Sequence, residues 1–191
     1  IEYVRALKAA DVIGHIGLST HAPEVAKRAA LSGEIEAVMF SVNPAFDLLP
    51  ATASLDDAFT FAYDDALEGM DPTRAELYAL CEREGVGLTV MKGYAGGRLF
   101  SAEASPFGAA MTPVQCIHYA LTRPAAASIL AGFDEPAHVD DAVAYETATE
   151  AQKDYASVLA GAPKHAYFGQ CTYCGHCAPC PAGIDIAAVN K

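Results

Sequence analysis

The chain has 191 residues, and its 24 acidic against 12 basic side chains give a net charge of −12, which argues against nucleic acid and anionic membrane surfaces as partners. Hydrophobic residues make up 52% and charged residues 19%, so the chain can build a packed core and is not an intrinsically disordered protein. No apolar run reaches the roughly 18 residues that a membrane span needs, and we expect no secretory leader and a cytoplasmic location.

Four short apolar runs, each bounded by turn residues, predict strands that are buried on both faces, as in a parallel sheet. In chain order these strands are Ile13–Leu18, Glu36–Ser41, Gly87–Lys92 and Ala127–Ala131. A helical pattern precedes the first strand, and another follows each of the four. These helices are Glu2–Ala10, Pro23–Leu31, Pro72–Glu84, Pro113–Leu121 and Glu135–Tyr145. The alternation predicts an α/β fold with a parallel sheet.

Local signals mark the ends of individual helices. Asp71 stands as the N-cap of the helix Pro72–Glu84, and Gly85 is its C-terminal stop. One further helix is predicted over Thr147–Leu159, because its first residue and Glu150 have the spacing of a capping box. A cysteine-rich tail follows this extra helix.

The four strand–helix units make an incomplete architecture. An open sheet of four strands leaves two unpaired edges, which invite aggregation. A complete (β/α)₈ barrel needs about 250 residues, and roughly half of that length precedes the tail. We therefore expect the C-terminal half of a (β/α)₈ barrel, with its first half missing from this sequence or supplied by an oligomeric partner. The predicted parts are a half barrel over 1–146, a linking helix and connector over 147–168, and a small iron–sulfur segment over 169–191.

The iron–sulfur prediction comes from the tail, where four of the six cysteines crowd together: Cys171, Cys174, Cys177 and Cys180. Three successive Cys-x-x-Cys steps let thiolates turn together around a compact centre, as in the ferredoxin run C-x₂-C-x₂-C-x₃-C-P, which binds [4Fe–4S] clusters. The last spacing is shorter here, so Cys180 closes either the same cluster or a neighbouring one. We favour a [4Fe–4S] cluster over a structural zinc with four thiolates, and both over disulfides. Cys81 and Cys116 are expected to be buried small hydrophobic residues.

A second candidate site follows the third predicted strand. In a parallel α/β barrel the chemistry lies at the carboxyl ends of the strands. The stretch from Lys92 to Arg98 follows such an end and holds both cations and glycines, which predicts a phosphate cradle. The alternative is a flexible turn with solvated charges. His21, after the first strand, is either a ligand or catalytic side chain or a support for the next helix.

Four segments at the strand ends carry a family resemblance: Ile16–His21, Phe40–Pro44, Gly87–Lys92 and Leu130–Phe133. In this order, and joined to the cysteine tail, they resemble strands five to eight of the aldo/keto reductases, in the branch of that superfamily that contains iron–sulfur clusters. The resemblance implies a barrel that binds a nicotinamide cofactor, usually NADPH, and transfers hydride to or from a carbonyl substrate. The catalytic Asp, Tyr, Lys and His of that family come from its first four strands, so no residue of this chain is assigned to catalysis.

The resemblance also assigns positions along the dinucleotide. Ser19 and Thr20 would lie near the nicotinamide amide, Lys92 and Gly93 along the pyrophosphate, and Gly132, Phe133 and Asp134 near the adenosine ribose. Arg98 joins this set as the second cation of the glycine-rich stretch.

Three positions depart from the family pattern. Thr20 stands where the family often has Asn and Met39 where it often has Gln, which weakens two amide contacts to the nicotinamide. Asp134 stands where a basic residue commonly meets the 2′-phosphate, and a carboxylate instead favours a free ribose hydroxyl. We therefore predict that NADH binds at least as well as NADPH, or that dinucleotide binding is altered or absent.

Two function hypotheses follow. The first is an NAD(P)-linked oxidoreductase acting on a small carbonyl-type substrate, with a cluster that exchanges single electrons with a partner. A direct relay between hydride and cluster then needs a flavin, a quinone-like substrate or sequential steps. The alternative is a non-enzymatic electron-transfer or structural module, in which the four cysteines hold a structural cluster or zinc.

Overall fold

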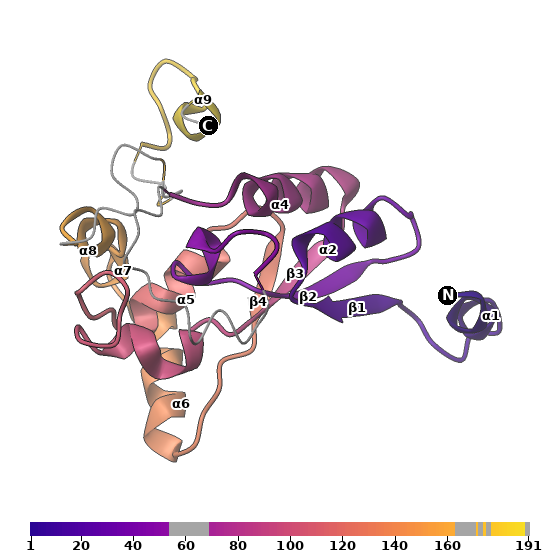
Figure 1. Ribbon diagram of the computed structural model, residues 1–191, viewed down its shortest axis with the longest axis horizontal. Helices are drawn as coiled ribbons and strands as arrows, with labels where there is room; N and C mark the ends of the chain where they lie inside the picture. Colours follow the sequence, from indigo (N-terminus) through magenta and orange to yellow (C-terminus); the bar gives the residue numbers. More distant parts are fainter. Residues whose placement is uncertain (54–68, 163–170, 172–173, 175–176, 190–191) are drawn as a thin grey trace.

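A single sheet organises the computed structural model, which describes residues 1–53, 69–162, 171, 174 and 177–189 (Figure 1). All strand pairs are parallel, and the strands follow one another in the order β1-β2-β3-β4. Their bounds are β1 (Gly17–Thr20), β2 (Ala37–Ser41), β3 (Gly87–Met91) and β4 (Ala126–Ile129). The predicted α/β fold with a parallel sheet is confirmed.

Helices connect the strands, as the alternation in the sequence predicted. The α-helices are α1 (Glu2–Ala9), α2 (Pro23–Ala30), α4 (Pro72–Glu84), α5 (Pro113–Leu121), α6 (Pro136–Val143), α7 (Glu150–Lys153), α8 (Ala156–Ala160) and α9 (Ile186–Val189). Short 3₁₀ helices occupy Phe46–Leu48, Ala95–Phe100 and Ala144–Thr147. Helix α2 packs against β1 and α4, and α5 packs against β4 and α6. None of the helices in the described ranges combines the length and the apolar composition of a membrane span.

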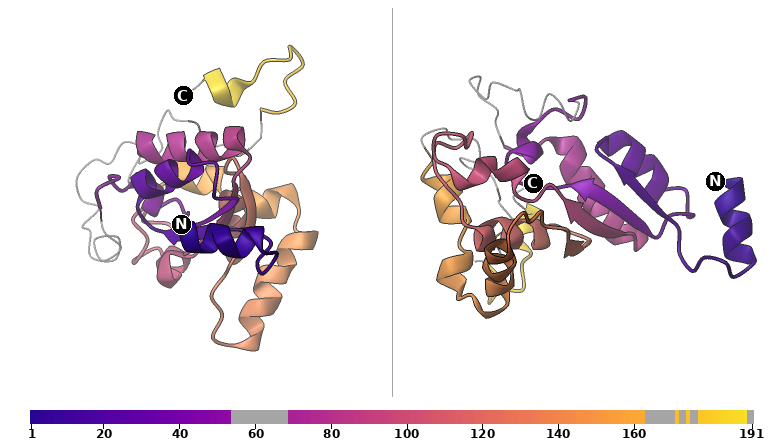
Figure 2. Two further views of the ribbon diagram at one scale, coloured as in Figure 1. Left: turned by 90° about the vertical axis from the view of Figure 1, so that its right-hand side faces the viewer. Right: turned by 90° about the horizontal axis from the view of Figure 1, so that it is seen from below.

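Helix α1 stands away from the sheet (Figures 1 and 2). None of its residues is buried. Two ion pairs join it to the segment just before β2: Arg5 Nε lies 3.0 Å from Glu34 Oε2, and the Lys8 ammonium pairs with Glu36. Its attachment therefore combines these ion pairs with the packing of the partly buried Val4 against the core.

The helix-covered face of the sheet forms the hydrophobic core. Val38 and Phe40 on β2 lie in register with Leu88 and Val90 on β3, and all four side chains are fully buried. Burying each such side chain contributes about 1.5–3 kcal/mol relative to leaving it in water. This alternation fixes which face of each strand meets the helices.

The opposite face of the sheet is more accessible. Ser19, Met39, Thr89 and Ser128 form one register row across the four strands, and each is partly or fully exposed. The Ser128 hydroxyl donates to Thr89 Oγ1 at 3.2 Å. In a closed barrel, residues on this face would fill the interior.

A buried polar cluster ties the segment after β2 to two helices. Asp47 is fully buried and accepts hydrogen bonds from the Tyr78 hydroxyl at 2.5 Å and the Tyr119 hydroxyl at 2.7 Å. The Arg74 guanidinium lies 3.6 Å from the same carboxylate and donates to the Ser41 carbonyl at 3.1 Å. Burial raises the pKa of Asp47, and the nearby Arg74 charge opposes that shift. The cluster joins β2, α4 and α5.

The ends of α4 confirm the local sequence signals. The Asp71 carboxylate accepts from the backbone N–H of Thr73 at 2.9 Å and of Arg74 at 3.3 Å. Gly85 ends the helix with a left-handed φ of 69°, which a residue with a side chain rarely adopts. Both residues have the roles that the sequence predicted.

The predicted helix Thr147–Leu159 was wrong, because the structure breaks it into α7 and α8. Thr149, not Thr147, caps α7, and it forms a capping box with Gln152. Asp154 then ends α7, and its carboxylate accepts from the backbone N–H of Ser157 at 3.0 Å. The local contacts of Thr149 and Asp154 with the backbone therefore divide a segment whose sequence pattern predicts one helix.

The first strand was also misplaced. The structure begins β1 at Gly17 and extends it to Thr20, whereas the apolar pattern had placed it at Ile13–Leu18. Ile13 and the residues up to Ile16 instead connect α1 to the sheet, where only the Ile16 carbonyl reaches the backbone N–H of Glu36, at 2.9 Å. Apolar pattern alone could not separate a linker from a strand here.

Candidate functional site

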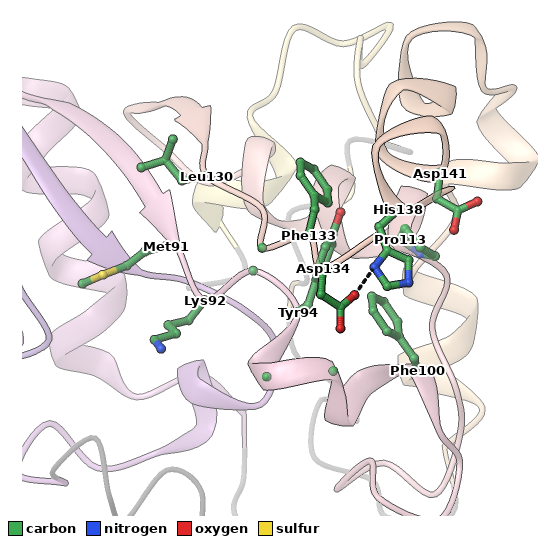
Figure 3. Close-up of a pocket in the computed structure, with 14 residues that line it drawn as sticks. Met91, Lys92, Tyr94, Phe100, Pro113, Leu130, Phe133, Asp134, His138 and Asp141 are labelled. Atoms are coloured by element: carbon green, nitrogen blue, oxygen red, sulfur yellow. Dashed lines mark ion pairs between the residues drawn. The ribbon is translucent and has the colours of Figure 1, made fainter. Parts of the chain in front are cut away.

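A cavity of about 600 Å³ opens where β3 and β4 end (Figure 3). Five of the eight predicted cofactor residues line it: Lys92, Gly93, Gly132, Phe133 and Asp134. These residues come from the ends of two adjacent parallel strands, which is where α/β proteins place their ligand sites. Ser19, Thr20 and Arg98 are not among the residues that line the cavity.

The backbone after β3 forms the floor of the cavity. Lys92 has a φ of 61°, and its carbonyl accepts a hydrogen bond from Asn43 Nδ2 at 2.9 Å. At Gly93 a Cβ atom would lie 2.6 Å from Ile129 Cδ1, so the missing side chain lets this turn approach β4 closely. Gly96 and Gly97 then take left-handed φ values of 67° and 84°. The glycines that suggested a phosphate cradle thus have a clear backbone role.

Aromatic side chains form much of the cavity wall. The rings of Tyr94 and Phe100 lie 4.9 Å apart between centroids, and Phe100 and Phe133 are 40% and 44% exposed. Burial raises the pKa of Tyr94 to about 12, so this phenol stays protonated. Its hydroxyl is buried and has no hydrogen-bond partner among the described residues. Such walls suit a flat, partly polar ring.

One rim of the cavity is acidic. Asp134 turns toward His138 in Figure 3, with 2.7 Å between Oδ1 and Nδ1. His138 Nε2 also lies 3.2 Å from Glu135 Oε1. Asp141 lines the same cavity, whereas Lys92 lies at the end of β3. The charge of the site is therefore divided between a cation on one strand end and carboxylates on the other.

Several lining side chains were not among the predicted site residues, and three of them are aromatic or titratable rings. Tyr94 lies inside the glycine-rich stretch, Phe100 follows it closely, and His138 comes four residues after Asp134. The signal was the position of Asp134 just before the start of α6, from which its carboxylate reaches His138 in the first turn of that helix. Nothing local in the sequence showed that Phe100 faces this cavity.

The residues at the carboxyl end of β1 form a separate group. Thr20 Oγ1 accepts from the backbone N–H of Ala22 at 3.1 Å, which supports the start of α2. Burial lowers the pKa of His21, and the positive charges of Lys92 and Arg74 lower it further, so the ring favours its neutral form. His21 does not line the cavity. Its buried Nδ1 has no hydrogen-bond partner among the described residues, and no side chain caps α2 by a hydrogen bond, so both interpretations of His21 stay predictions.

The six cysteines fall into two groups, and none of them forms a disulfide. Cys81 and Cys116 are fully buried, as predicted, and burial raises their pKa values to about 11 and about 12. These two thiols are therefore poor metal ligands at neutral pH.

The tail cysteines are more accessible. Cys177 is exposed, and Cys171, Cys174 and Cys180 are half-buried. Within the part of the chain that the structure describes, no group of three or more His, Cys, Asp or Glu side chains is placed to hold a metal ion. By its chemistry, a set of four thiols suits an iron–sulfur or zinc centre, although the four described side chains do not come together as a metal site in this structure.

The comparisons with known proteins place the fold. No protein-family model matches the chain, and no curated protein matches it either. Among solved structures, the chain is similar to the aldo-keto reductase AKR11C1 from Bacillus halodurans in its holo form, with a TM-score of 0.56 and 18% identity. The match covers 87% of this chain but only 58% of the reductase. The chain therefore has an α/β fold with four parallel strands that matches part of an aldo-keto reductase barrel.

Proposed function

We propose that the chain is the C-terminal half of an aldo/keto reductase-type (β/α)₈ barrel, and that the cavity at β3 and β4 binds the adenosine and phosphate part of a nicotinamide dinucleotide. The observation that carries this proposal is that five residues assigned to the dinucleotide line one cavity at the carboxyl ends of two adjacent strands. When bound, the dinucleotide supplies or accepts a hydride, and the substrate is a small carbonyl-type compound.

The cavity residues supply the contacts that such a ligand needs. The Lys92 ammonium and the turn at Gly93 offer positive charge and close backbone approach to phosphate. The aromatic wall of Phe100 and Phe133 offers a surface for a flat ring. The Asp134 carboxylate accepts a hydrogen bond from a ribose hydroxyl but repels a phosphate at the same position.

Calorimetry with NADH and NADPH tests the dinucleotide site. Lys92→Ala should weaken binding about tenfold, the effect of losing roughly 1.4 kcal/mol of interaction with phosphate. The matched control is Lys27→Ala, because Lys27 pairs with Glu76 on α4 and does not line the cavity. Equal affinities of the wild type and Lys92→Ala would remove Lys92 from the site.

We also propose that Cys171, Cys174, Cys177 and Cys180 bind a [4Fe–4S] cluster, which exchanges single electrons with a partner. The proposal is supported by the repeated Cys-x-x-Cys spacing, by the absence of disulfides and by the packing of Cys174 against the hydrophobic core. Iron and sulfide counts with an EPR spectrum of anaerobically purified protein test it. Cys177→Ser should lose iron, while Cys81→Ala should keep it. Colourless, iron-free wild-type protein contradicts the proposal.

A second candidate function is a non-enzymatic electron-transfer or structural module. It is favoured by the position of Ser19 and Thr20 outside the cavity. The same two experiments separate the candidates. Metal in the tail without measurable dinucleotide binding supports the module, and dinucleotide binding supports the oxidoreductase.

A further inference from the structure

One buried amide joins the segment after β2 to the floor of the cavity. Asn43 lies just beyond the last residue of β2 and is fully buried. Its Nδ2 donates to the Lys92 carbonyl at 2.9 Å, and its Oδ1 accepts from the backbone N–H of Phe46 at 2.8 Å. Because one partner is a carbonyl and the other an N–H, only one orientation of the amide satisfies both. The Asn43 side chain therefore bridges two backbone segments that are far apart in the chain.

The turn that receives this hydrogen bond has an unusual backbone. Lys92 and Ala95 have φ values of 61° and 49°, in the left-handed region that residues with a side chain rarely adopt. The Lys92 carbonyl also accepts from the backbone N–H of Ala95 at 2.8 Å. Glycine would adopt this φ more readily, but it would supply no cation to the cavity. A strained backbone persists where its surroundings hold it, and Asn43 supplies such a hold from outside the turn.

The other end of the bridge is also fixed. The Asn43 carbonyl accepts from the backbone N–H of Asp47 at 3.0 Å. The Asp47 carboxylate in turn accepts from the hydroxyls of Tyr78 on α4 and Tyr119 on α5. Asn43 therefore connects the turn at Lys92 to a buried part of the fold that two helices hold in place.

We propose that Asn43 is a positioning residue for the dinucleotide cavity: its amide holds the Lys92 carbonyl and so sets the position from which the Lys92 ammonium reaches phosphate. This inference rests on the proposed dinucleotide site. Asn43 does not line the cavity, so it acts through Lys92 rather than by touching the ligand. A site whose side chains are held in place before the ligand arrives binds more tightly, because less ordering is needed on binding.

Calorimetry with ADP-ribose on the intact chain tests this role, since the probe carries the adenosine and the diphosphate without the nicotinamide. Asn43→Asp keeps an oxygen for the Phe46 N–H but removes the donor to the Lys92 carbonyl. It should weaken binding about five- to tenfold, the effect of losing one buried hydrogen bond. Asn43→Ala, which adds no charge, should weaken binding at least as much. Circular dichroism and thermal melting of each variant report whether it folds.

Gln115→Glu is the matched control. Gln115 also bridges two backbone groups, because its Nε2 donates to the Asp154 carbonyl at 2.8 Å and its Oε1 accepts from the backbone N–H of Thr112 at 2.9 Å. It does not line the cavity. The same change from amide to carboxylate at this position should leave the affinity for ADP-ribose as in the wild type.

A double-mutant cycle with Lys92→Ala shows whether Asn43 acts through Lys92. In the Lys92→Ala background the further loss of affinity caused by Asn43→Ala should shrink to about twofold or less, since the side chain that Asn43 positions is already gone. A general loosening of the fold would instead weaken binding by the same factor in both backgrounds.

The outcomes separate the two proposals. Absence of ADP-ribose binding in the wild type overturns the dinucleotide site, and this inference falls with it. Equal affinities of the wild type and both Asn43 variants overturn this inference alone, as does equal weakening by Asn43→Asp and Gln115→Glu. Weakening by Asn43→Asp but not by Asn43→Ala also overturns it, because the added charge is then the cause. Equal factors in the two backgrounds of the cycle overturn it as well. If Asn43→Ala does not fold, Asn43→Ser, whose hydroxyl is too short to reach the Lys92 carbonyl, takes its place.

Discussion

At the scale of single residues, Asp47 shows how a side chain that looks unremarkable in the sequence organises the interior. Its carboxylate accepts from two phenols on different helices and lies near a buried guanidinium. Removing a buried charged acceptor leaves its donors buried without partners. The protein then loses more free energy of unfolding than the hydrogen bonds themselves contribute.

We predict that Asp47→Ala lowers the free energy of unfolding by about 3–5 kcal/mol, because Arg74, Tyr78 and Tyr119 all lose this acceptor. Urea denaturation followed by circular dichroism measures the change. Asp140→Ala on the exposed surface of α6 is the control, and it should change the free energy by less than about 0.5 kcal/mol. A similar small change for Asp47→Ala would show that the cluster does not stabilise the fold.

The predicted preference between NADH and NADPH depends on Asp134. Its side chain is 89% exposed at the cavity rim and pairs with His138. We expect wild-type protein to bind NADH at least as tightly as NADPH, and Asp134→Arg to shift the preference toward NADPH by about tenfold. Calorimetry measures both affinities, with Asp140→Arg as a charge-matched control outside the cavity. A clear NADPH preference in the wild type contradicts the assignment of Asp134.

At the scale of elements, the break between α7 and α8 allows a direct comparison of two threonines. The capping box of Thr149 replaces the one expected at Thr147. Thr149→Ala should lower the free energy of unfolding by about 1 kcal/mol, the usual cost of losing an N-cap. Thr147→Ala should have almost no effect. If Thr147→Ala instead lowered the free energy of unfolding more than Thr149→Ala does, the prediction of a single long helix would be supported.

Helix α1 offers a pH-dependent test. Hydrogen bonds from Lys8, and secondarily from His15, lower the pKa of Glu36 from 4.5 to about 2. Because the pKa of Glu36 is lower in the folded state than in the unfolded state, the stabilisation that its ion pairs give is present above pH 4.5 and is lost as the pH falls toward 2. The protection factors of the α1 amides, which correct hydrogen exchange for its intrinsic pH dependence, should therefore fall over this range.

Substitution of Glu36 separates this contact from general acid unfolding. Glu36→Gln should give fast exchange in α1 already at neutral pH, with little change in the strands. Glu76→Gln is the control, because Glu76 pairs with Lys27 on α2 rather than with α1. Unchanged exchange in α1 of Glu36→Gln would show that packing, not charge, holds this helix.

At the scale of the whole molecule, the sheet has a covered and an accessible face. Among the described strands, β1 and β4 each pair with one neighbour, and the row from Ser19 to Ser128 lies on the accessible face. Unpaired parallel edges and an uncovered face favour association with further strands.

We therefore predict that the isolated chain sediments as a dimer or larger assembly, or binds a separately expressed barrel half, with burial of the row that contains Met39 and Thr89. Sedimentation velocity and hydrogen exchange of β2 and β3 measure this. A well-folded, concentration-independent monomer would show that the accessible face needs no cover.

The sequence by itself determined the alternation of strands and helices, the caps of α4 and the burial of Cys81 and Cys116. These features depend on residues that are neighbours in the chain, or on apolar patterns that repeat along it. Only the tertiary structure decided that Tyr94, Phe100 and His138 face one cavity and that Asp47 joins two helices. Such contacts depend on strand register and helix packing, which bring together residues far apart in the chain and leave no local signal in the sequence.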